Sequence, residues 1–378
     1  MAFGSSDLTL QRRESSYPRA DELRCAPFGR PLVGAPIKLL ELLAAVGYDG
    51  FGWSDGALHL RSVALFCGMP LPVALLQSSP VFFDKQATLE KLADLASEQA
   101  RAGAKLIVFP ESFVPGYPRG FDFGAVVGSR TDAGRELYAA YHRASVDLES
   151  EDRPRLEKLA RDLGVYLAVG VTERSRRHGS LYCSLLYLSP THGLLGVHRK
   201  IKPTGTERLI WAEAGGEDLL TFDTAIGRLG GLICWENYMP LARAALYRQG
   251  VDLWIAPTAD ARDGWTATMQ HVTLEGRCFV LGCNQYVTAE MLPAAYRELL
   301  TDPARAESRG GSVIVSPLGE ILAGPLYGEE GVVSAELDLE DVVRARLDFD
   351  VTGHYARPDI FELRVRGQPE QVAEPSDG

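Results

Sequence analysis

From Pro72 onward, apolar residues recur with two distinct periods. Residues 73–77 ("VALLQ") and 105–110 ("KLIVFP") are apolar runs of strand length, and the second is typical of a strand buried on both faces. Between them, residues 84–103 carry apolar side chains at helical spacing and end in a glycine. The pattern therefore predicts a strand, a helix and a second strand in succession.

This unit recurs along the chain. The same criteria predict helices over residues 153–164, 238–250 and 265–277, and strands over residues 165–173, 228–234, 251–258 and 278–285. Two hairpins are predicted over residues 180–200, with a Pro-Thr-His-Gly turn, and over residues 311–325. Alternation of this kind indicates an α/β sandwich with mixed sheets.

The two ends of the chain differ from this regular part. We expect an N-terminal extension over residues 1–70, which has little periodicity apart from a helical patch at 37–47. The folded domain is expected over residues 71–363, and a polar, disordered tail over 364–378. Met69 falls just before the regular pattern, so two hypotheses stay open: a natural start at Met69, or a true appendage that packs on the domain.

Composition excludes several classes of partner. The 378 residues carry a net charge of -11, which argues against nucleic acid and against anionic membranes as partners. No apolar run reaches the roughly 18 residues of a membrane-spanning helix, and the N-terminus lacks the apolar middle of a signal peptide. The six cysteines form no CxxC pair and no Cys/His metal spacing, so we expect reduced thiols in a cytoplasmic protein without a metal site.

Reactive side chains follow three of the predicted strands. Glu111 follows a buried strand and a proline, Lys200 follows the second strand of the first hairpin, and Cys234 ends another strand. Glu207 lies seven residues beyond Lys200. Because binding crevices in open α/β sheets form at the carboxyl ends of strands, we expect these groups to converge there.

A cysteine nucleophile reacts as the thiolate, although a free thiol has a pKa of about 8.5. Lys200 could supply a cation that stabilises the thiolate, and Glu111 could accept the proton. A helix predicted to begin near Asn237, as its N-cap, would add partial positive charge. This set suits attack on an electrophilic carbon bonded to nitrogen, with Lys200 stabilising the charge that develops.

These segments resemble the nitrilase family of carbon–nitrogen hydrolases. The motifs that carry the resemblance are "VFPESFVPGYPRGFDFG", "HRKIKPTGTERLIW", "CWENYMPLAR", "APTADARDGWTATMQHVTLEGRCFVLGCNQ" and "GHYARPDIF". They occur in the family's order and span roughly residues 72–363. The pair Trp235-Glu236 after the cysteine resembles true nitrilases more than amidases or carbamoylases.

The resemblance implies a mechanism and an architecture. Cys234 would be the nucleophile, Glu111 the general base, Lys200 the catalytic lysine, and Glu207 a second glutamate that supports the lysine and the intermediate. A small-molecule nitrile would become a carboxylic acid and ammonia through a thioimidate and a thioester, without metal or organic cofactor. The implied fold is a four-layer α-β-β-α sandwich in a homo-oligomer, with larger spirals or filaments common among such enzymes.

Two other functions stay open: an amidase or carbamoylase of the same superfamily, and a non-catalytic scaffold on this fold. Other side chains near the motifs have competing interpretations as well. His198 and His271 are interpreted as structural histidines, and Cys183, Cys278 and Cys283 as core residues. Four aromatic residues are candidates for lining a substrate pocket, although each could equally be core: Tyr117, Trp211, Trp235 and Trp265.

Overall fold

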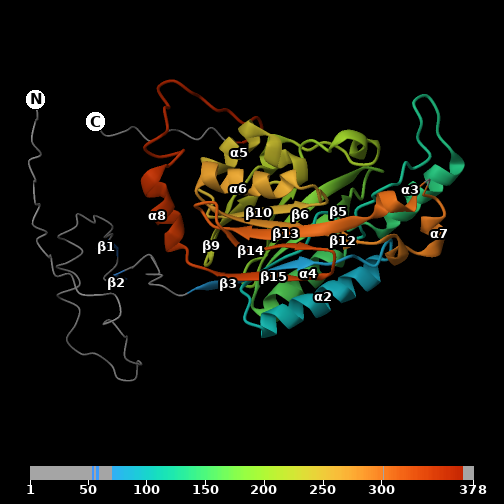
Figure 1. Cartoon of the computed structure of the whole chain (residues 1–378), viewed down its shortest axis with the longest axis horizontal. Helices are drawn as coiled ribbons and strands as arrows, with labels where there is room; N and C mark the ends of the chain where they lie inside the picture. The colour runs from blue at the N-terminus through green and yellow to red at the C-terminus, as the bar shows by residue number, and fades with distance from the viewer. Residues whose placement is uncertain (1–52, 55–56, 59–69, 301, 369–378) are drawn as a thin grey trace, which may run out of the picture. The chain divides into compact units, whose positions relative to one another are not determined.

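The computed structural model describes residues 53–54, 57–58, 70–300 and 302–368 (Figure 1). The chain divides into two compact units, Met1–Phe66 and Cys67–Gly378. Within the first, strands β1 (Trp53–Ser54) and β2 (Ala57–Leu58) pair antiparallel. The helical patch at 37–47 and the alternative start at Met69 lie outside the described residues, so the division of the chain near residue 70 stays a prediction.

The second unit contains two mixed sheets. The first sheet has the order β15 (Gly331–Leu337), β3 (Leu71–Gln77), β4 (Leu106–Val108), β5 (Tyr166–Arg174), β6 (Leu181–Ser189), β7 (Gly193–Arg199). The second has the order β12 (Tyr286–Val287), β13 (Ser308–Val315), β11 (Phe279–Asn284), β10 (Leu253–Thr258), β9 (Gly227–Gly231), β8 (Phe222–Thr224), with β14 (Ile321–Tyr327) also pairing with β13. In each sheet three neighbouring strands are parallel, β3–β4–β5 and β9–β10–β11.

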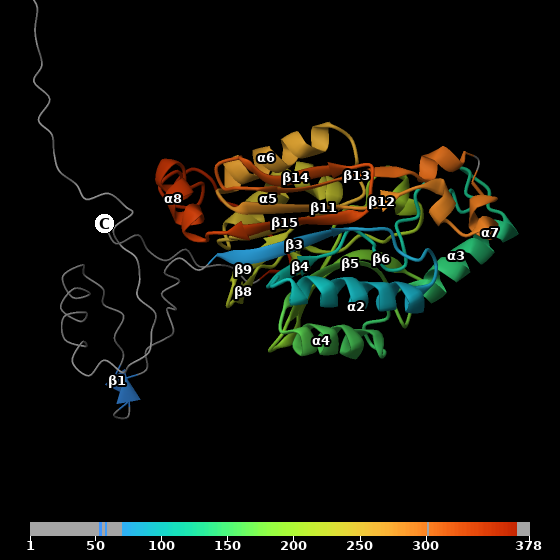
Figure 2. The ribbon, with the colours of Figure 1, turned by 60° about the horizontal axis from the view of Figure 1, so that its bottom comes forward.

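Helices cover the outer faces of both sheets, as Figure 2 shows. On the first sheet lie α2 (Lys85–Arg101) and α4 (Asp152–Leu163), and on the second lie α5 (Pro240–Tyr247) and α6 (Gly264–Gly276). Three further helices lie away from these layers: α3 (Asp132–Ala144), α7 (Ala294–Arg297) and α8 (Glu340–Asp348). The order of layers is helix, sheet, sheet, helix, which confirms the expected four-layer sandwich.

Alternation along the central strands explains why the layers stack in this way. Successive side chains of a strand point to opposite faces. On β10, Leu253 and Ile255 join the core between the two sheets, whereas Trp254 packs beneath α5 and α6. On β3, Leu75 points into the same central core, and Leu76 packs beneath α2 and α4. Strands buried on both faces therefore appear in the sequence as continuous apolar runs.

The predicted helices and strands of this unit are confirmed, with some shifted ends. Asp84 caps α2 by accepting a hydrogen bond from the Ala87 N–H at 2.9 Å. Gly164 ends α4 with a φ of 66°, a left-handed conformation that glycine adopts without penalty. Helices α3 and α8 and strands β8 and β15 were not predicted.

The last described residues keep contact with the second sheet layer. Leu363 and Val365 pack against the apolar cluster beneath α5 and α6, and Gln368 donates a hydrogen bond to the Gly216 carbonyl at 3.1 Å. The rest of the expected tail, residues 369–378, lies outside the described residues. Among the helices that the structure describes, none combines the length and apolar character needed to cross a membrane.

Candidate active site

Glu111 follows β4 and is held in a tight, fully buried segment. This segment runs so close to β5 that a Cβ on Gly170 would lie 2.0 Å from the Pro110 carbonyl oxygen, so only glycine fits there. Ser112 adopts a positive φ of 48°, which turns the chain immediately after the glutamate. The Glu111 Oε2 atom accepts a hydrogen bond from the Ala259 N–H at 2.8 Å. Glu111 is thereby fixed between the two sheets.

Lys200 directly follows β7, and its whole side chain is buried. The Lys200 Nζ atom lies 2.7 Å from Glu111 Oε1 and 2.8 Å from Glu207 Oε2. The ammonium also lies over the ring of Trp211, 5.8 Å from its centroid. The structure thus brings together the lysine and both glutamates that were singled out in the sequence.

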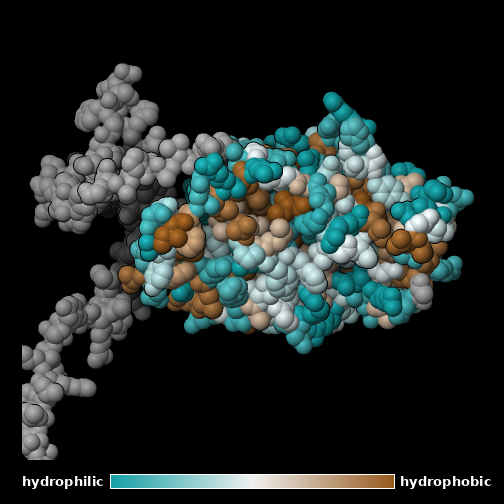
Figure 3. Space-filling view, turned by 90° about the horizontal axis from the view of Figure 1, so that it is seen from above, coloured by the Kyte–Doolittle hydropathy of each residue, from teal (hydrophilic) through white to brown (hydrophobic). Residues whose placement is uncertain are grey.

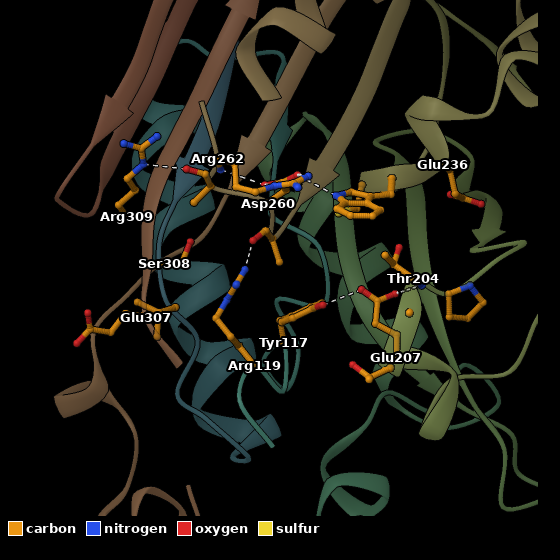
Figure 4. Close-up of a pocket in the computed structure, with 18 of the residues that line it drawn as sticks. Tyr117, Arg119, Thr204, Glu207, Glu236, Asp260, Arg262, Glu307, Ser308 and Arg309 are labelled. Carbon is orange, nitrogen blue, oxygen red and sulfur yellow. Dashed lines mark hydrogen bonds and ion pairs between the residues drawn. The ribbon is translucent and has the colours of Figure 1, made fainter. Parts of the chain in front are cut away.

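Glu207 is placed by the turn that carries it. It lies in a 3₁₀ turn, Gly205–Leu209, and its Oε2 accepts the Thr204 N–H at 2.6 Å in a capping box. Its Oε1 accepts the Tyr117 hydroxyl at 2.7 Å, the bond drawn in Figure 4. The Lys200 ammonium is the third donor to Glu207, after Thr204 and Tyr117. These three hydrogen bonds fix the position of the Glu207 carboxylate.

Cys234 occupies a sharp turn shortly after β9. It adopts a positive φ of 52°, a strained conformation for a residue other than glycine that is often found at functional sites. The side chain of Asn237 stabilises this turn by donating to the carbonyls of Leu232 and Cys234, both at 2.8 Å. The Thr258 hydroxyl donates to the Cys234 sulfur at 3.1 Å. The thiol is thus held at the end of its strand.

The helix predicted over residues 238–250 is present but begins later, so the expectation that Asn237 is its N-cap was wrong. Residues Cys234–Tyr238 form a 3₁₀ turn, and α5 starts at Pro240, a residue suited to the first helical position. The Asn237 side chain points inward and also accepts the Trp254 indole N–H at 2.8 Å. Its role is to hold the turn rather than to cap the helix.

Charges in the site favour a protonated thiol beside a carboxylate and an ammonium. Burial raises the pKa of Cys234 far above its usual range, and the negative charge of Glu111 raises it further. Burial also raises the pKa of Glu111, an effect that Lys200 opposes. For Lys200, burial lowers the pKa, but the surrounding negative groups, Glu111 foremost, together outweigh burial, so the pKa lies well above the ordinary value. The lysine therefore does not keep the resting cysteine ionised, in contrast to the argument from sequence, and the thiol must lose its proton during attack.

Glu236, which entered the sequence analysis only through the Trp235-Glu236 pair, is a central residue of the site. It is fully buried and accepts the Ile233 N–H at 2.8 Å and the Ile201 N–H at 2.7 Å. It also pairs with His198 Nε2 at 2.9 Å. Glu236 thereby joins the backbone beside Cys234 to the backbone beside Lys200. Only the three-dimensional pairing of these segments reveals this role.

A cavity of about 1200 Å³ is lined in part by Cys234, and Figure 4 shows other residues of its wall. Cys234, Glu207 and Tyr117 lie in its wall, whereas Glu111 and Lys200 lie behind the surface. Trp235 also lines the cavity and is 40% exposed. Among the four aromatic candidates, two therefore reach the cavity.

The other two aromatic candidates lie elsewhere. Trp211 is buried and packs edge-on against Tyr117, with 5.5 Å between the ring centroids. Trp265 is buried in the apolar cluster beneath α5 and α6. Neither lines the cavity. Both were candidates because they adjoin the motifs, but proximity in sequence does not decide which way a ring faces.

Trp235 is fixed by two groups that sequence reasoning also missed. Its indole N–H donates to Asp260 Oδ2 at 2.8 Å, and the Arg262 guanidinium lies over its ring, 4.6 Å from the centroid. Figure 4 shows Asp260 and Arg262 close together at the cavity. Asp260 follows β10, in a loop whose sequence carries no distinctive periodicity.

The remaining candidates have structural surroundings. His198 is buried, and its Nδ1 lies 3.1 Å from the Asp218 carbonyl, opposite the bond to Glu236. His271 is exposed on α6. Cys278 and Cys283 are buried in apolar clusters, whereas Cys183 adjoins Glu111. Within residues 70–300 and 302–368, no cluster of three or more His, Cys, Asp or Glu side chains is arranged to hold a metal ion.

Comparison with known proteins supplies a family. Residues 72–347 match the family model "Carbon-nitrogen hydrolase". An aliphatic nitrilase of Sinorhizobium fredii (strain HH103) is 47% identical over 300 residues, covering 79% of this chain and 96% of that protein. Nitrilase 3 of Arabidopsis thaliana is 45% identical over 305 residues, covering 79% of this chain and 88% of that protein.

Solved structures share the fold at lower identity. Nit3 of Saccharomyces cerevisiae, a member of branch 10 of the nitrilase superfamily, aligns with a TM-score of 0.60 at 22% identity, over 76% of this chain and 97% of that chain. A carbon–nitrogen hydrolase of Helicobacter pylori G27 aligns with a TM-score of 0.61 at 20% identity, over 77% of this chain and 97% of that chain. The solved structures share the fold, and the family model together with the sequence relatives gives the assignment: the chain belongs to the carbon–nitrogen hydrolase family, and within it to the nitrilases.

Proposed function

We propose that this protein hydrolyses a nitrile to the carboxylic acid and ammonia, with Cys234 as the nucleophile. The observation that carries the proposal is the arrangement of three groups beside one cavity. Lys200 lies 2.7 Å from Glu111, and the charges of both groups act on the Cys234 thiol in the cavity wall. The identity of 47% to an aliphatic nitrilase supports the choice of a nitrile as substrate.

The first step is attack of sulfur on the nitrile carbon. Because the pKa of the Cys234 thiol is raised, the thiol loses its proton to Glu111 as the carbon–sulfur bond forms. Glu111 then delivers this proton to the nitrile nitrogen, and a neutral thioimidate results. The raised pKa of Glu111 suits this exchange, because a group that both accepts and returns a proton works best when its pKa lies near the operating pH.

Two molecules of water complete the reaction. Glu111 removes a proton from the first water, whose oxygen adds to the thioimidate carbon, and passes this proton to the nitrogen. The hydroxyl proton of the adduct then moves to the same nitrogen, the carbon–nitrogen bond breaks, and ammonia leaves as the thioester carbonyl forms. The remaining thioester is attacked by a second water in the same manner, which releases the carboxylic acid and restores the thiol. The sum is one nitrile and two waters converted to one acid and one ammonia.

Lys200 stabilises the charge that develops on the nitrile nitrogen and later on oxygen. An ammonium has three N–H donors, and two of those of Lys200 are directed to Glu111 and Glu207. The third is left for the substrate. The backbone N–H of Trp235 is a second donor to this charge. It lies at the start of the 3₁₀ turn Cys234–Tyr238, where backbone N–H groups have no acceptor within the turn. Glu207 positions the lysine.

Substrate contacts belong to the same proposal. Tyr117 and Trp235 are proposed walls for the organic part of the nitrile, because both line the cavity near the thiol. Trp235 is held by Asp260 and Arg262, so its ring presents a defined surface rather than a mobile one. Trp211 and Trp265 are not part of this proposed wall, since both are packed in the interior.

The test is ammonia release from aliphatic, aromatic and arylaceto-nitriles and from the matching amides. We expect release from at least one class of nitrile, with carboxylic acid as the main product. Cys234→Ala should abolish it, whereas Cys278→Ala, a control at a buried thiol beneath α5 and α6, should retain it. Ammonia released only from amides would favour an amidase, and no ammonia from either panel would favour a scaffold.

We also propose a homo-oligomer, as expected from the sequence. Large apolar side chains are exposed on α5, α6 and α8, namely Leu241, Leu274, Val343 and Leu347. Figure 3, which views the face with α5, shows apolar patches among polar ones. Light scattering after size-exclusion chromatography should give at least twice the mass of one chain, and a spiral would appear as a larger, concentration-dependent species. The cytoplasm remains the predicted compartment.

A further inference from the structure

Cys183 lies on β6, directly against the proposed general base. Its side chain is fully buried, and its Sγ donates a hydrogen bond to Glu111 Oε1 at 3.5 Å. Its backbone carbonyl accepts the Lys200 N–H at 2.8 Å. This residue therefore contacts both the base and the segment that carries the lysine, although the proposed reaction assigns it no step.

The Cys183 thiol can act only as a donor to this carboxylate. Burial raises the pKa of Cys183 well above its usual range, and the charge of Glu111 raises it further, so the S–H keeps its proton throughout the working pH range. An ionised carboxylate has acceptors only, so the shared proton belongs to sulfur. A hydrogen bond to a charged acceptor is stronger than one between neutral groups.

Three donors share the two oxygens of Glu111. Oε2 accepts the Ala259 N–H at 2.8 Å, and Oε1 accepts the Lys200 ammonium at 2.7 Å. The Cys183 thiol is the third donor, at 3.5 Å from Oε1. It approaches Oε1 from β6, so it restrains rotation of the carboxylate about its last bond.

We propose that Cys183 is a positioning residue, whose S–H orients Glu111 and favours its ionised form. The inference rests on the proposed role of Glu111 as general base. Cys183 itself forms no bond to the substrate and exchanges no proton. The hydrogen bond from Cys183 has a consequence for pH dependence: Glu111 stays ionised, and therefore active as a base, to a lower pH than it would without the thiol.

The experiment compares variants that differ in donor and in volume. Cys183→Ala removes the donor and leaves a gap, Cys183→Val removes it and fills the space, and Cys183→Ser keeps a donor. The control is Cys283→Ala, because the Cys283 thiol lies in the same central core but donates to the Val108 carbonyl at 3.4 Å. The readout is kcat/KM against pH with the best nitrile.

We expect the acidic limb of kcat/KM to move to higher pH by about half a unit to one unit in Cys183→Ala and Cys183→Val, because one hydrogen bond to the ionised form is lost. Cys183→Ser should move it less, and Cys283→Ala should not move it. If Cys183→Ala does not fold, the Val variant carries the test. An unmoved limb in Cys183→Val, or an equal shift in Cys283→Ala, would overturn the proposal.

A second readout separates this inference from the proposed function. Infrared titration follows the protonated carboxyl of Glu111 without turnover, and its band is assigned by its loss in Glu111→Gln. If the band of protonated Glu111 appears at a higher pH in Cys183→Val than in the wild type, and no nitrile is hydrolysed, the positioning role is supported and nitrile hydrolysis is rejected. Normal nitrile hydrolysis with an unshifted band would reject the positioning role alone.

Discussion

Replacing Lys200 with methionine removes one charge from the centre of the site and little else. The two side chains have similar length, but methionine carries no ammonium. In the native site Nζ lies 2.7 Å from Glu111 and 2.8 Å from Glu207, and the lysine is entirely buried. Two carboxylates and one ammonium sum to one negative charge, so Lys200→Met leaves two negative charges without a counter-ion between them.

The cost follows from the burial of these groups. Removing one partner of a buried ion pair typically costs about 3–5 kcal/mol, because a buried charge is left uncompensated. Removing a preorganised donor to the developing charge lowers kcat by about 10²–10³. The double variant Lys200→Met/Glu207→Gln returns the site to one negative charge. It should recover stability, with a coupling of about 0.5–3 kcal/mol, but it should not recover activity.

Urea unfolding measures the stability of the wild type and of both variants, and ammonia release measures their activity. The control is Lys158→Met, which removes an exposed lysine paired with Asp162 one turn along α4 and should cost no more than about 1 kcal/mol. The reasoning is refuted if Lys200→Met unfolds at the same urea concentration as the control variant. It is also refuted if the double variant is no more stable than Lys200→Met.

Three further predictions follow from other parts of the structure. The kcat/KM of the wild type should fall toward acid with an apparent pKa above that of an ordinary glutamate, because burial raises the pKa of Glu111; a pH profile checks this. Glu330→Gln should lower the melting temperature at pH 7, because hydrogen bonds from Ser79 and Lys91 hold the pKa of Glu330 at about 2, despite burial that raises it. That difference should shrink as pH falls from the usual glutamate range toward 2, since the stabilisation is lost as the folded carboxylate protonates; melting curves against pH check it. Gly170→Ala should lower both stability and kcat, because its Cβ would meet the Pro110 carbonyl at 2.0 Å beside the base; unfolding and ammonia assays check it.

The layers of the fold were accessible from the sequence because burial on both faces leaves a visible pattern. Residues 253–257 are apolar throughout, since β10 contacts the central core on one side and α5 and α6 on the other. Strand β15 was missed because its pattern is weaker: Leu337 is buried, but Val332 is exposed at the side of the sheet. Edge strands contact fewer neighbours and so have less marked sequences.

The convergence of Glu111, Lys200 and Cys234 was predictable from a general rule, because each follows a strand and strand ends meet at one edge. The groups that support them were not. Glu236 accepts hydrogen bonds from backbone on both sides of the site, and Cys183 reaches Glu111 from a different strand. Such contacts depend on how strands pair, which residue spacing alone does not encode.

The most direct test of the account is to identify the atom that bonds to the substrate. Enzyme turning over its best nitrile is quenched in acid within one turnover, digested, and analysed by mass spectrometry. The account predicts the added mass of the imidate or acyl group on the peptide that contains Cys234, and no such mass in Cys234→Ala. The same mass on the peptide with Cys183, Cys278 or Cys283, or continued hydrolysis by Cys234→Ala, would contradict it.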